Sequence, residues 1–268
     1  MRFFPYLSVH FFMMKRNIYL VGLMLLATAC VKRPVPETPG TIVVPETKPT
    51  ANLEMTLDNR VGAEDLSLGN KWYITPNGDS IQIDIYAYYI SNIVLNGPGG
   101  TKYIEPESYH LVDEARPATH KFTIKDVSPG TYTSLTFMIG VDSARNVSGA
   151  QTGDLSPQYG MFWDWNTGYI MAKLEGVSPQ SEIEQVLYHM GGFTKEWGVL
   201  RTVTLSLPSP LVIKENNTSH MHIENDVMEW FQNPVKVDLK TTHLLSDKYE
   251  VKMMADNYAD MFTVDHVE

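Results

Sequence analysis

The feature that most constrains the fold of this chain is a two-residue alternation of apolar and polar side chains. Leu53, Met55 and Leu57 alternate with polar residues, and residues 81–85 repeat the pattern. In an extended strand successive side chains point to opposite faces, so an alternating segment is covered on one face only. The pattern therefore predicts strands of half-buried β-sheets.

Five further segments are rich in β-branched and aromatic residues and are predicted to be strands. They are residues 86–95, 132–141, 168–174, 199–207 and 235–239. Turn-forming sequences separate them, as in Pro-Asn-Gly-Asp at 76–79. We predict an all-β fold, an immunoglobulin-like β-sandwich with long loops and one or two short helices. Asn225 or Asp226 can cap one helix that ends near Phe231, and Ser246 or Asp247 can begin another.

The N-terminus has the features of an export signal. Lys15 and Arg16 precede an apolar run at 18–26, and three small residues lead to Cys30. This order is typical of a secretory signal, and the run is shorter than the roughly 20 residues that span a bilayer. The cysteine after the small residues resembles a bacterial lipobox, which predicts a lipid anchor on Cys30. An ordinary signal peptide followed by an unmodified thiol is the alternative.

These features divide the chain into three predicted parts: a lipoprotein signal peptide at 1–29, a lipidated cysteine with a Pro-rich tether at 30–51, and one β-sandwich domain at 52–268. The tether contains five prolines and has no apolar periodicity, as expected of an extended, solvated spacer. Cys30 is the only cysteine, so the domain contains no internal disulfide. The expected location is the cell envelope, lipid-anchored at the outer membrane or a periplasmic face.

Charge and missing motifs exclude several functions. Removing residues 1–29 leaves 18 basic and 31 acidic residues, a formal charge of −13, which repels nucleic acid. The chain has no Gly-x-Ser-x-Gly nucleophile motif, no phosphate-binding glycine loop and no His-Glu-x-x-His helix. We therefore expect a protein that is not an enzyme.

Histidines and tryptophans are the candidate metal-site residues. Trp163 and Trp165 are two residues apart and could share one face of a strand, although two tryptophans can also simply anchor a core. His222 follows His220 by two positions in a segment that we also expect to be a strand, so these two imidazoles could share a face. His189 is followed by Met190 and then by two glycines, and His266 is near the C-terminus. Imidazoles from several segments bind a transition metal if they converge, whereas a single histidine more often has a hydrogen-bonded structural role.

Two other sets of possible ligands remain open. Asp142, Asn146 and Asp154 in a Gly-rich loop could supply oxygen ligands to calcium, or could hydrogen-bond the loop's own backbone. The thioethers nearest the candidate residues would favour Cu(I), or could be ordinary core filling. They belong to Met161, Met190 and Met221.

Several sequence blocks, taken in order, resemble the MbnP-like family of exported copper-binding proteins, first recognised beside methanobactin genes. They are Tyr-Ile-Ser-Asn-Ile at 89–93, Tyr-His-Leu-Val-Asp at 109–113, residues 137–146, Phe-Trp-Asp-Trp-Asn-Thr-Gly-Tyr at 162–169, and Tyr-His-Met-Gly-Gly at 188–192. The resemblance covers roughly residues 53–231, and the lipobox, tether and acidic domain look like a Bacteroidetes-type lipoprotein member.

The resemblance implies a β-sandwich that binds one copper ion. Some relatives carry a tryptophan oxidised to kynurenine beside the copper-binding histidines, and a dihaem peroxidase-like partner performs that oxidation. Trp163 and Trp165 match the tryptophan block, so either could yield the kynurenine, and His189 matches the Tyr-His block. His222 and His266 are added from spacing and position.

The chain departs from the family at Asn59, where relatives often have a histidine, and it has no disulfide cysteines. The predicted function is copper binding for metal acquisition or handling, which requires His189, His222 and His266 to converge. The alternative is a surface binding or adhesion module in which Trp163 and Trp165 contact a glycan or protein partner.

Overall fold

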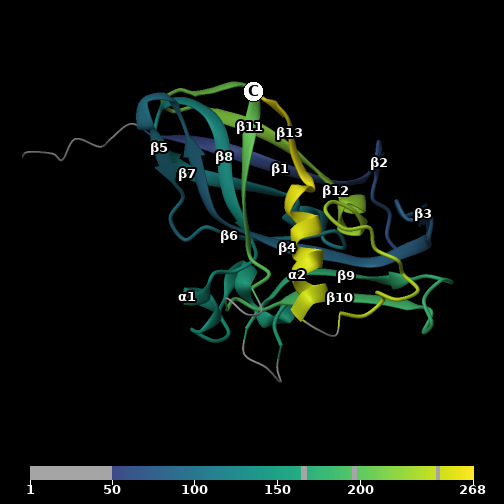
Figure 1. The fold of residues 1–268 in the computed structure, drawn as a ribbon. Helices are drawn as coiled ribbons and strands as arrows, with labels where there is room; N and C mark the ends of the chain where they lie inside the picture. Colours follow the sequence, from purple (N-terminus) through teal and green to yellow (C-terminus); the bar gives the residue numbers. More distant parts are fainter. Residues whose placement is uncertain (1–49, 164–167, 195–197, 246–247) are drawn as a thin grey trace, which may run out of the picture. The chain divides into compact units, whose positions relative to one another are not determined.

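In this computed structural model the described residues are 50–163, 168–194, 198–245 and 248–268. The predicted signal peptide, Cys30 and the tether up to residue 49 lie outside them, as do Trp165 and the predicted helix start at Ser246 or Asp247. Residues Thr47–Glu268 belong to one compact unit. Its described part is dominated by strands in two sheets, which confirms the all-β sandwich (Figure 1).

One sheet, called the β1 sheet, has the strand order β13-β12-β1-β2, and β7 also pairs with β1. Its strands are β1 (Ala51–Val61), β2 (Glu64–Asp65), β7 (Lys121–Val127), β12 (Thr218–Asp226) and β13 (Phe262–Val267). β1 and β12 run parallel, whereas β12 and β13 are antiparallel. The alternation recognised in β1 is confirmed, because Leu53, Met55 and Leu57 are fully buried and the residues between them are partly exposed.

The other sheet, called the β4 sheet, has the order β10-β9-β4-β8-β11, and three short strands also pair with β4. Its strands are β3 (Trp72–Ile74), β4 (Ser80–Asn96), β5 (Lys102–Ile104), β6 (Tyr109–Asp113), β8 (Gly130–Ile139), β9 (Ile170–Val177), β10 (Gln185–Gly191) and β11 (Arg201–Ile213). A bulge between Ser91 and Val94 divides β4, and Asn92 there adopts a φ of 55°. β4 can therefore change neighbours along its length.

An aromatic core fills the space between the sheets. Tyr86 and Tyr88 of β4 are fully buried, and the Tyr88 ring packs against Phe262 of β13 with 5.5 Å between centroids. The Tyr86 ring lies 6.1 Å from that of Trp230, which follows β12. Side chains that alternate with these inward-facing residues point out of the sandwich, and the two outer faces point in opposite directions.

A long loop after β8 covers part of the outer side of the β4 sheet. It contains α1 (Ser143–Asn146) and the 3₁₀ helices η3 (Gly153–Leu155) and η4 (Pro157–Tyr159). The Tyr89 hydroxyl donates to the Asp154 carbonyl (3.1 Å), and the Tyr169 hydroxyl donates to the Leu155 carbonyl (2.9 Å). This loop explains why the middle of β4 is buried on both faces.

The remaining helices are short. They are η1 (Pro98–Gly100), η2 (Pro117–Thr119), η5 (Val227–Phe231), α2 (Lys248–Asn257) and η6 (Tyr258–Asp260). The predicted cap is confirmed, because the Asp226 carboxylate accepts a hydrogen bond from the Met228 amide (3.0 Å) at the start of η5. Among the residues described, no helix is long and apolar enough to cross a membrane.

The predicted strand at 235–239 is wrong. Val237 and Leu239 are buried as the alternation suggested, yet side chains bind the backbone here. The Val235 amide donates to Asn257 and the Leu239 amide donates to Asp79, each at 3.1 Å. Because these donors are already satisfied, the segment packs onto the core without pairing with a strand.

Candidate metal centre

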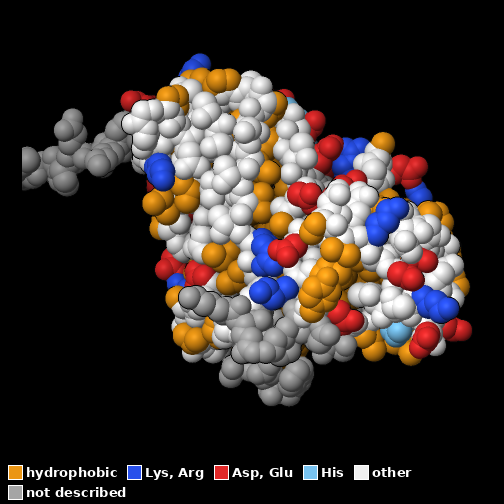
Figure 2. Space-filling view, viewed as in Figure 1, with side chains coloured by type: hydrophobic (Ala, Val, Ile, Leu, Met, Phe, Trp, Pro, Cys, Tyr) orange, Lys and Arg blue, Asp and Glu red, His pale blue; other side chains and the backbone are white. Residues whose placement is uncertain are grey.

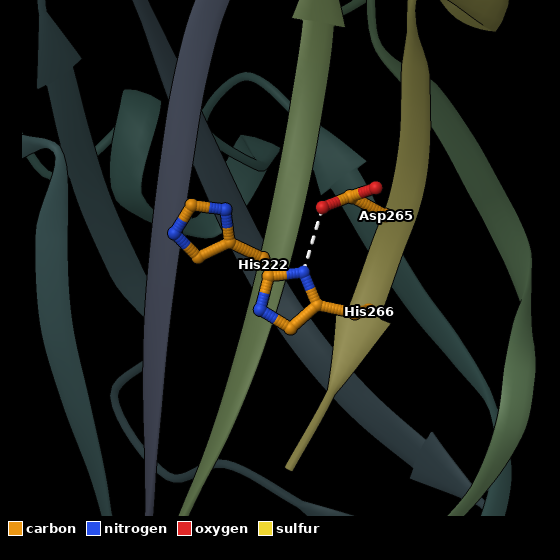
Figure 3. A group of neighbouring side chains, drawn as sticks. All are labelled: His222, Asp265 and His266. Atoms are coloured by element: carbon orange, nitrogen blue, oxygen red, sulfur yellow. Dashed lines mark hydrogen bonds and ion pairs between the residues drawn. The ribbon is translucent and has the colours of Figure 1, made fainter.

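His222 and His266 face each other on the outer face of the β1 sheet (Figure 3). They are direct cross-strand partners on β12 and β13, and their rings stack with 4.9 Å between centroids and 17° between planes. One potential ligand atom from each of His222, Asp265 and His266 lies within 4.8 Å of the other two. Two of the predicted histidines therefore lie close together, and Asp265, which was not predicted, lies beside them.

A β-bulge explains this grouping. In the register, His222 pairs with His266 and Ile223 pairs with Val264, so Asp265 is an extra residue on β13. A bulge breaks the simple alternation of side chains, and here both Asp265 and His266 are exposed while Val264 is buried. Two consecutive residues therefore reach the same surface.

His189 lies elsewhere, and the single pocket expected for the three histidines is not formed. It is on β10 of the β4 sheet, where Tyr188 and Met190 on either side are buried. His189 therefore faces outward from the β4 sheet, whereas His222 faces outward from the β1 sheet. The two sheets of the sandwich separate these faces, so no ion could contact both histidines.

Trp163 and His189, the two described residues matched from the family motifs, do share a surface. A Cβ atom placed on Gly191 would lie only 1.7 Å from Cη2 of Trp163, so the indole packs directly on the Gly191 backbone. The register between β9 and β10 shifts between Met190 and Gly191, with the extra residue on β9. Burial along β10 still alternates, so half-buried Gly191 lies on the face of half-buried His189, about 7 Å along the strand. The tryptophan block and the Tyr-His block, far apart in sequence, thus meet on the β4 sheet.

Glu175 holds the His189 ring. Nε2 of His189 lies 2.6 Å from Oε1 of Glu175, and the same oxygen lies 2.9 Å from Nζ of Lys173. Burial alone would raise the pKa of the Glu175 carboxyl, but the hydrogen bonds from Lys173 and His189 outweigh it and lower the pKa. Glu175 therefore remains an anion beside His189.

The loop oxygens considered for calcium each bind a protein donor. The Asp142 carboxylate accepts from the Tyr109 hydroxyl (2.7 Å), and Oδ1 of Asn146 accepts from the Tyr169 amide (2.8 Å). Asp154 accepts from the Leu111 amide at 3.3 Å. These contacts match the loop-stabilising alternative, and calcium binding at Asp142, Asn146 and Asp154 stays a prediction. The thioether residues Met161, Met190 and Met221 are buried in the core.

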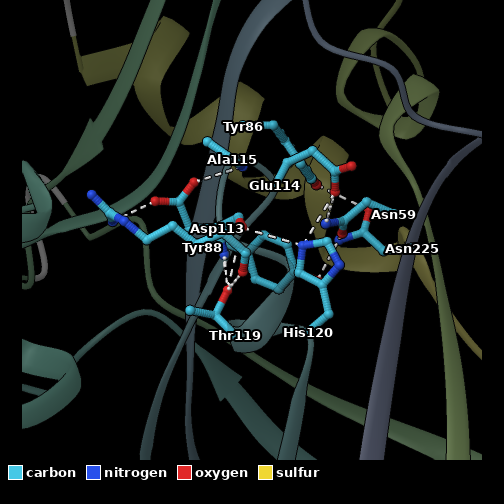
Figure 4. Close-up of polar contacts among 10 residues, drawn as sticks. Asn59, Tyr86, Tyr88, Asp113, Glu114, Ala115, Thr119, His120 and Asn225 are labelled. Carbon is cyan, nitrogen blue, oxygen red and sulfur yellow. Dashed lines mark hydrogen bonds and ion pairs between the residues drawn. The ribbon is translucent and has the colours of Figure 1, made fainter.

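Asn59 belongs to a buried polar network between the sheets (Figure 4). Its Oδ1 accepts from the Tyr88 hydroxyl (3.0 Å), and its Nδ2 donates to Glu114 (2.8 Å). Burial raises the pKa of the Glu114 carboxyl, and Nε2 of His120 lies 3.4 Å from that carboxylate. Asn59 therefore points inward, and its neighbour Asp58 is the β1 residue that contacts His222.

Sequence reasoning missed Asp58, Asp265 and Glu175. Sequence position could have identified two of them, because Asp58 lies at the end of a recognised strand and Asp265 directly precedes His266. Glu175 could not be identified in this way, because its contact with His189 depends on how β9 pairs with β10.

Comparison with known proteins places this fold in a family. The family model described as MbnP matches residues 50–253. The chain belongs to the MbnP family. The MbnP segment thus contains both motif blocks that meet at Gly191, but it ends before β13. A solved structure, MbnP from Methylosinus trichosporium, aligns with a TM-score of 0.43 and 14% identity, covering 68% of this chain and 77% of that chain. A search of curated proteins found no match.

Proposed function

We propose that this protein binds copper at the bacterial cell envelope and serves in metal acquisition or handling, without catalysing a reaction. Membership of the MbnP family suggests a copper-handling role related to methanobactin. The observation that carries the proposal is the packing of Trp163 on Gly191, on the face of β10 that bears His189. The tryptophan block and the Tyr-His block thereby lie together on the outer face of the β4 sheet.

The His189 imidazole is a donor of the type that copper favours. Imidazole nitrogen is a favoured ligand of copper, and a histidine that binds a metal commonly directs its other ring nitrogen to a carboxylate. Glu175 occupies that second position at Nε2 of His189. Nδ1 is then the ring nitrogen left for the metal, and no described residue hydrogen-bonds it.

The test is metal content after loading. Purified protein is incubated with Cu(II), desalted, and analysed for copper per chain by mass spectrometry. His189→Ala should lose bound copper, and Glu175→Gln should weaken binding about 10–100-fold because the ring loses its anionic partner. His220→Ala is the control, since His220 is exposed on the other sheet and pairs with Glu54. Equal copper content in wild type and His189→Ala would disprove this site.

The proposal extends to a modified tryptophan and its partner. Conversion of Trp163 or Trp165 to kynurenine by a dihaem peroxidase-like protein would supply a second donor group. Of the two, Trp163 packs on Gly191, which follows His189 by two positions on β10. Intact-mass measurement of protein purified from its native host should reveal the small fixed increment, and peptide mapping would assign it to one tryptophan. An unmodified mass would leave copper binding to the histidine alone.

Anchoring through Cys30 completes the proposal. A lipid on Cys30 would hold the domain at a membrane, with the Pro-rich segment as spacer. Cys30→Ser should move the protein from the membrane fraction to the soluble fraction of the envelope. Retention of the variant in the membrane fraction would contradict the anchor.

The adhesion alternative has less support. Trp163 is partly buried, and its indole carbons pack on Gly191, so part of the ring is not available to an external ligand. On the face visible in Figure 2, apolar side chains are interspersed with acidic and basic ones. The packing of Trp163 on β10, the strand that carries His189, fits the copper proposal better.

A further inference from the structure

We propose that His222, His266 and Asp265 form a second metal site, specific for a borderline divalent cation such as Cu(II). It does not depend on the proposed copper site at His189, because the two sites are on opposite outer faces of the sandwich. Two of its three ligands, Asp265 and His266, also lie beyond the segment that matches the MbnP family, residues 50–253.

The three side chains are already close to ligand geometry. With bonds of about 2.0–2.1 Å, the square-planar geometry that Cu(II) prefers separates its ligand atoms by about 2.9 Å when they are cis and about 4 Å when they are trans. The ligand atoms of His222, Asp265 and His266 all lie within 4.8 Å of one another. The three side chains are between 32% and 50% exposed, so small rotations can bring them onto one ion without disturbing the core.

The backbone holds these residues in place. β12 and β13 fix His222 opposite His266, and the bulge turns Asp265 to the same surface. Bulges commonly occur beside functional sites because they re-aim a side chain. The two imidazoles are therefore presented by a paired sheet, and they do not depend on a mobile loop.

Carboxylates surround the two imidazoles. Oδ2 of Asp58 lies 3.2 Å from Nδ1 of His222, and Oδ2 of Asp265 lies 2.6 Å from Nδ1 of His266. Oε1 of Glu268 lies 3.8 Å from Nε2 of His266. Asp58 contacts Nδ1 of His222 and orients the ring, so Nε2 is the nitrogen that can bind an ion. The combined negative charge of Asp58, Asp265 and Glu268 attracts a cation.

The donor types select the metal. Two imidazole nitrogens and one carboxylate suit Cu(II), Ni(II) and Zn(II), whereas calcium and magnesium prefer oxygen ligands only. Cu(I) prefers sulfur, and Met221, the nearest methionine in sequence, is fully buried. Among first-row divalent ions the Irving–Williams order places Cu(II) highest, so Cu(II) should bind more tightly than Zn(II).

The experiment is a Cu(II) titration of the purified protein, followed by electron paramagnetic resonance and by copper per chain. We expect nitrogen couplings from two imidazoles at one site. His266→Ala and His222→Ala should each abolish that signal and remove one copper, and Asp58→Asn should weaken binding about tenfold. His220→Ala, on the same strand and the same outer face, is the matched control and should bind like wild type.

His189→Ala separates this site from the proposed function. If both proposals hold, wild type binds two copper ions, and His189→Ala and His266→Ala each lose a different one. If His189→Ala leaves copper unchanged while His266→Ala removes it, only the proposed function at His189 fails. Unchanged copper and an unchanged resonance spectrum in His266→Ala would overturn the site on β12 and β13.

Discussion

Replacing Gly191 with alanine tests the contact on which the proposed copper site depends. The new Cβ would lie 1.7 Å from Cη2 and 2.0 Å from Cζ3 of Trp163. Carbon atoms in contact are normally 3.5–4.0 Å apart, so the indole must retreat by about 2 Å. Such overpacking typically costs about 1–3 kcal/mol. We expect Gly191→Ala to lower the free energy of unfolding by that amount.

Backbone strain does not contribute to this cost, because the φ angle of Gly191 lies outside the left-handed region. In a Trp163→Ala background the indole is gone and the added methyl has room. There, a glycine-to-alanine change should be neutral or stabilise by up to about 1 kcal/mol, since alanine restricts the unfolded chain. The two backgrounds should therefore differ by at least about 1 kcal/mol.

Urea unfolding followed by circular dichroism measures all four proteins of this cycle. The slope with urea should be unchanged between variants, so that a shift in midpoint reports stability alone. An equal cost of Gly191→Ala with and without the indole would refute the packing of Trp163 on β10. It would also remove the observation that joins the two family motifs.

Three further substitutions probe the buried polar groups. Tyr88→Phe removes the hydroxyl that donates to buried Asn59 and should cost about 1–3 kcal/mol in urea unfolding; no loss would mean that another donor replaces it. Asn146→Ala leaves the Tyr169 amide without its acceptor and should lower the free energy of unfolding by a similar amount. If calcium instead raises the melting temperature of the wild type and not that of Asn146→Ala, the loop binds calcium. Burial raises the folded-state pKa of Glu114 above its unfolded value of about 4.3. The free energy of unfolding of the wild type should therefore fall as the pH rises from the unfolded pKa through the folded pKa. Glu114→Gln should flatten this fall, and an equally steep fall in both proteins would contradict the argument.

Local patterns predicted much of the fold because burial in a strand has a period of two. Leu53, Met55 and Leu57 were assigned to the core by alternation alone, and Asp226 was recognised as a helix cap by residue type. The segment at 235–239 has the same alternation but is no strand, because Asn257 and Asp79 bind its amides. Those partners are distant in sequence, so no local pattern could reveal them.

The candidate sites were predictable only in part, for a related reason. The family motifs singled out Trp163 and His189, but their relation depends on the bare backbone at Gly191. His222 and His266 were singled out individually, yet their pairing depends on the register of β12 and β13. Strict alternation would place Asp265 and His266 on opposite faces, and only the bulge brings them together.

The separation of His189 from His222 follows from the architecture of any two-layer sandwich. Alternation tells whether a side chain faces the core or the solvent, but it does not tell to which sheet the strand belongs. Sheets pack about 10 Å apart, so outward side chains of different sheets are farther apart than that. Donors that share an ion with bonds near 2 Å must lie within about 4 Å of one another. Outward-facing histidines can therefore form one site only if their strands belong to the same sheet, as β12 and β13 do and as β10 and β12 do not.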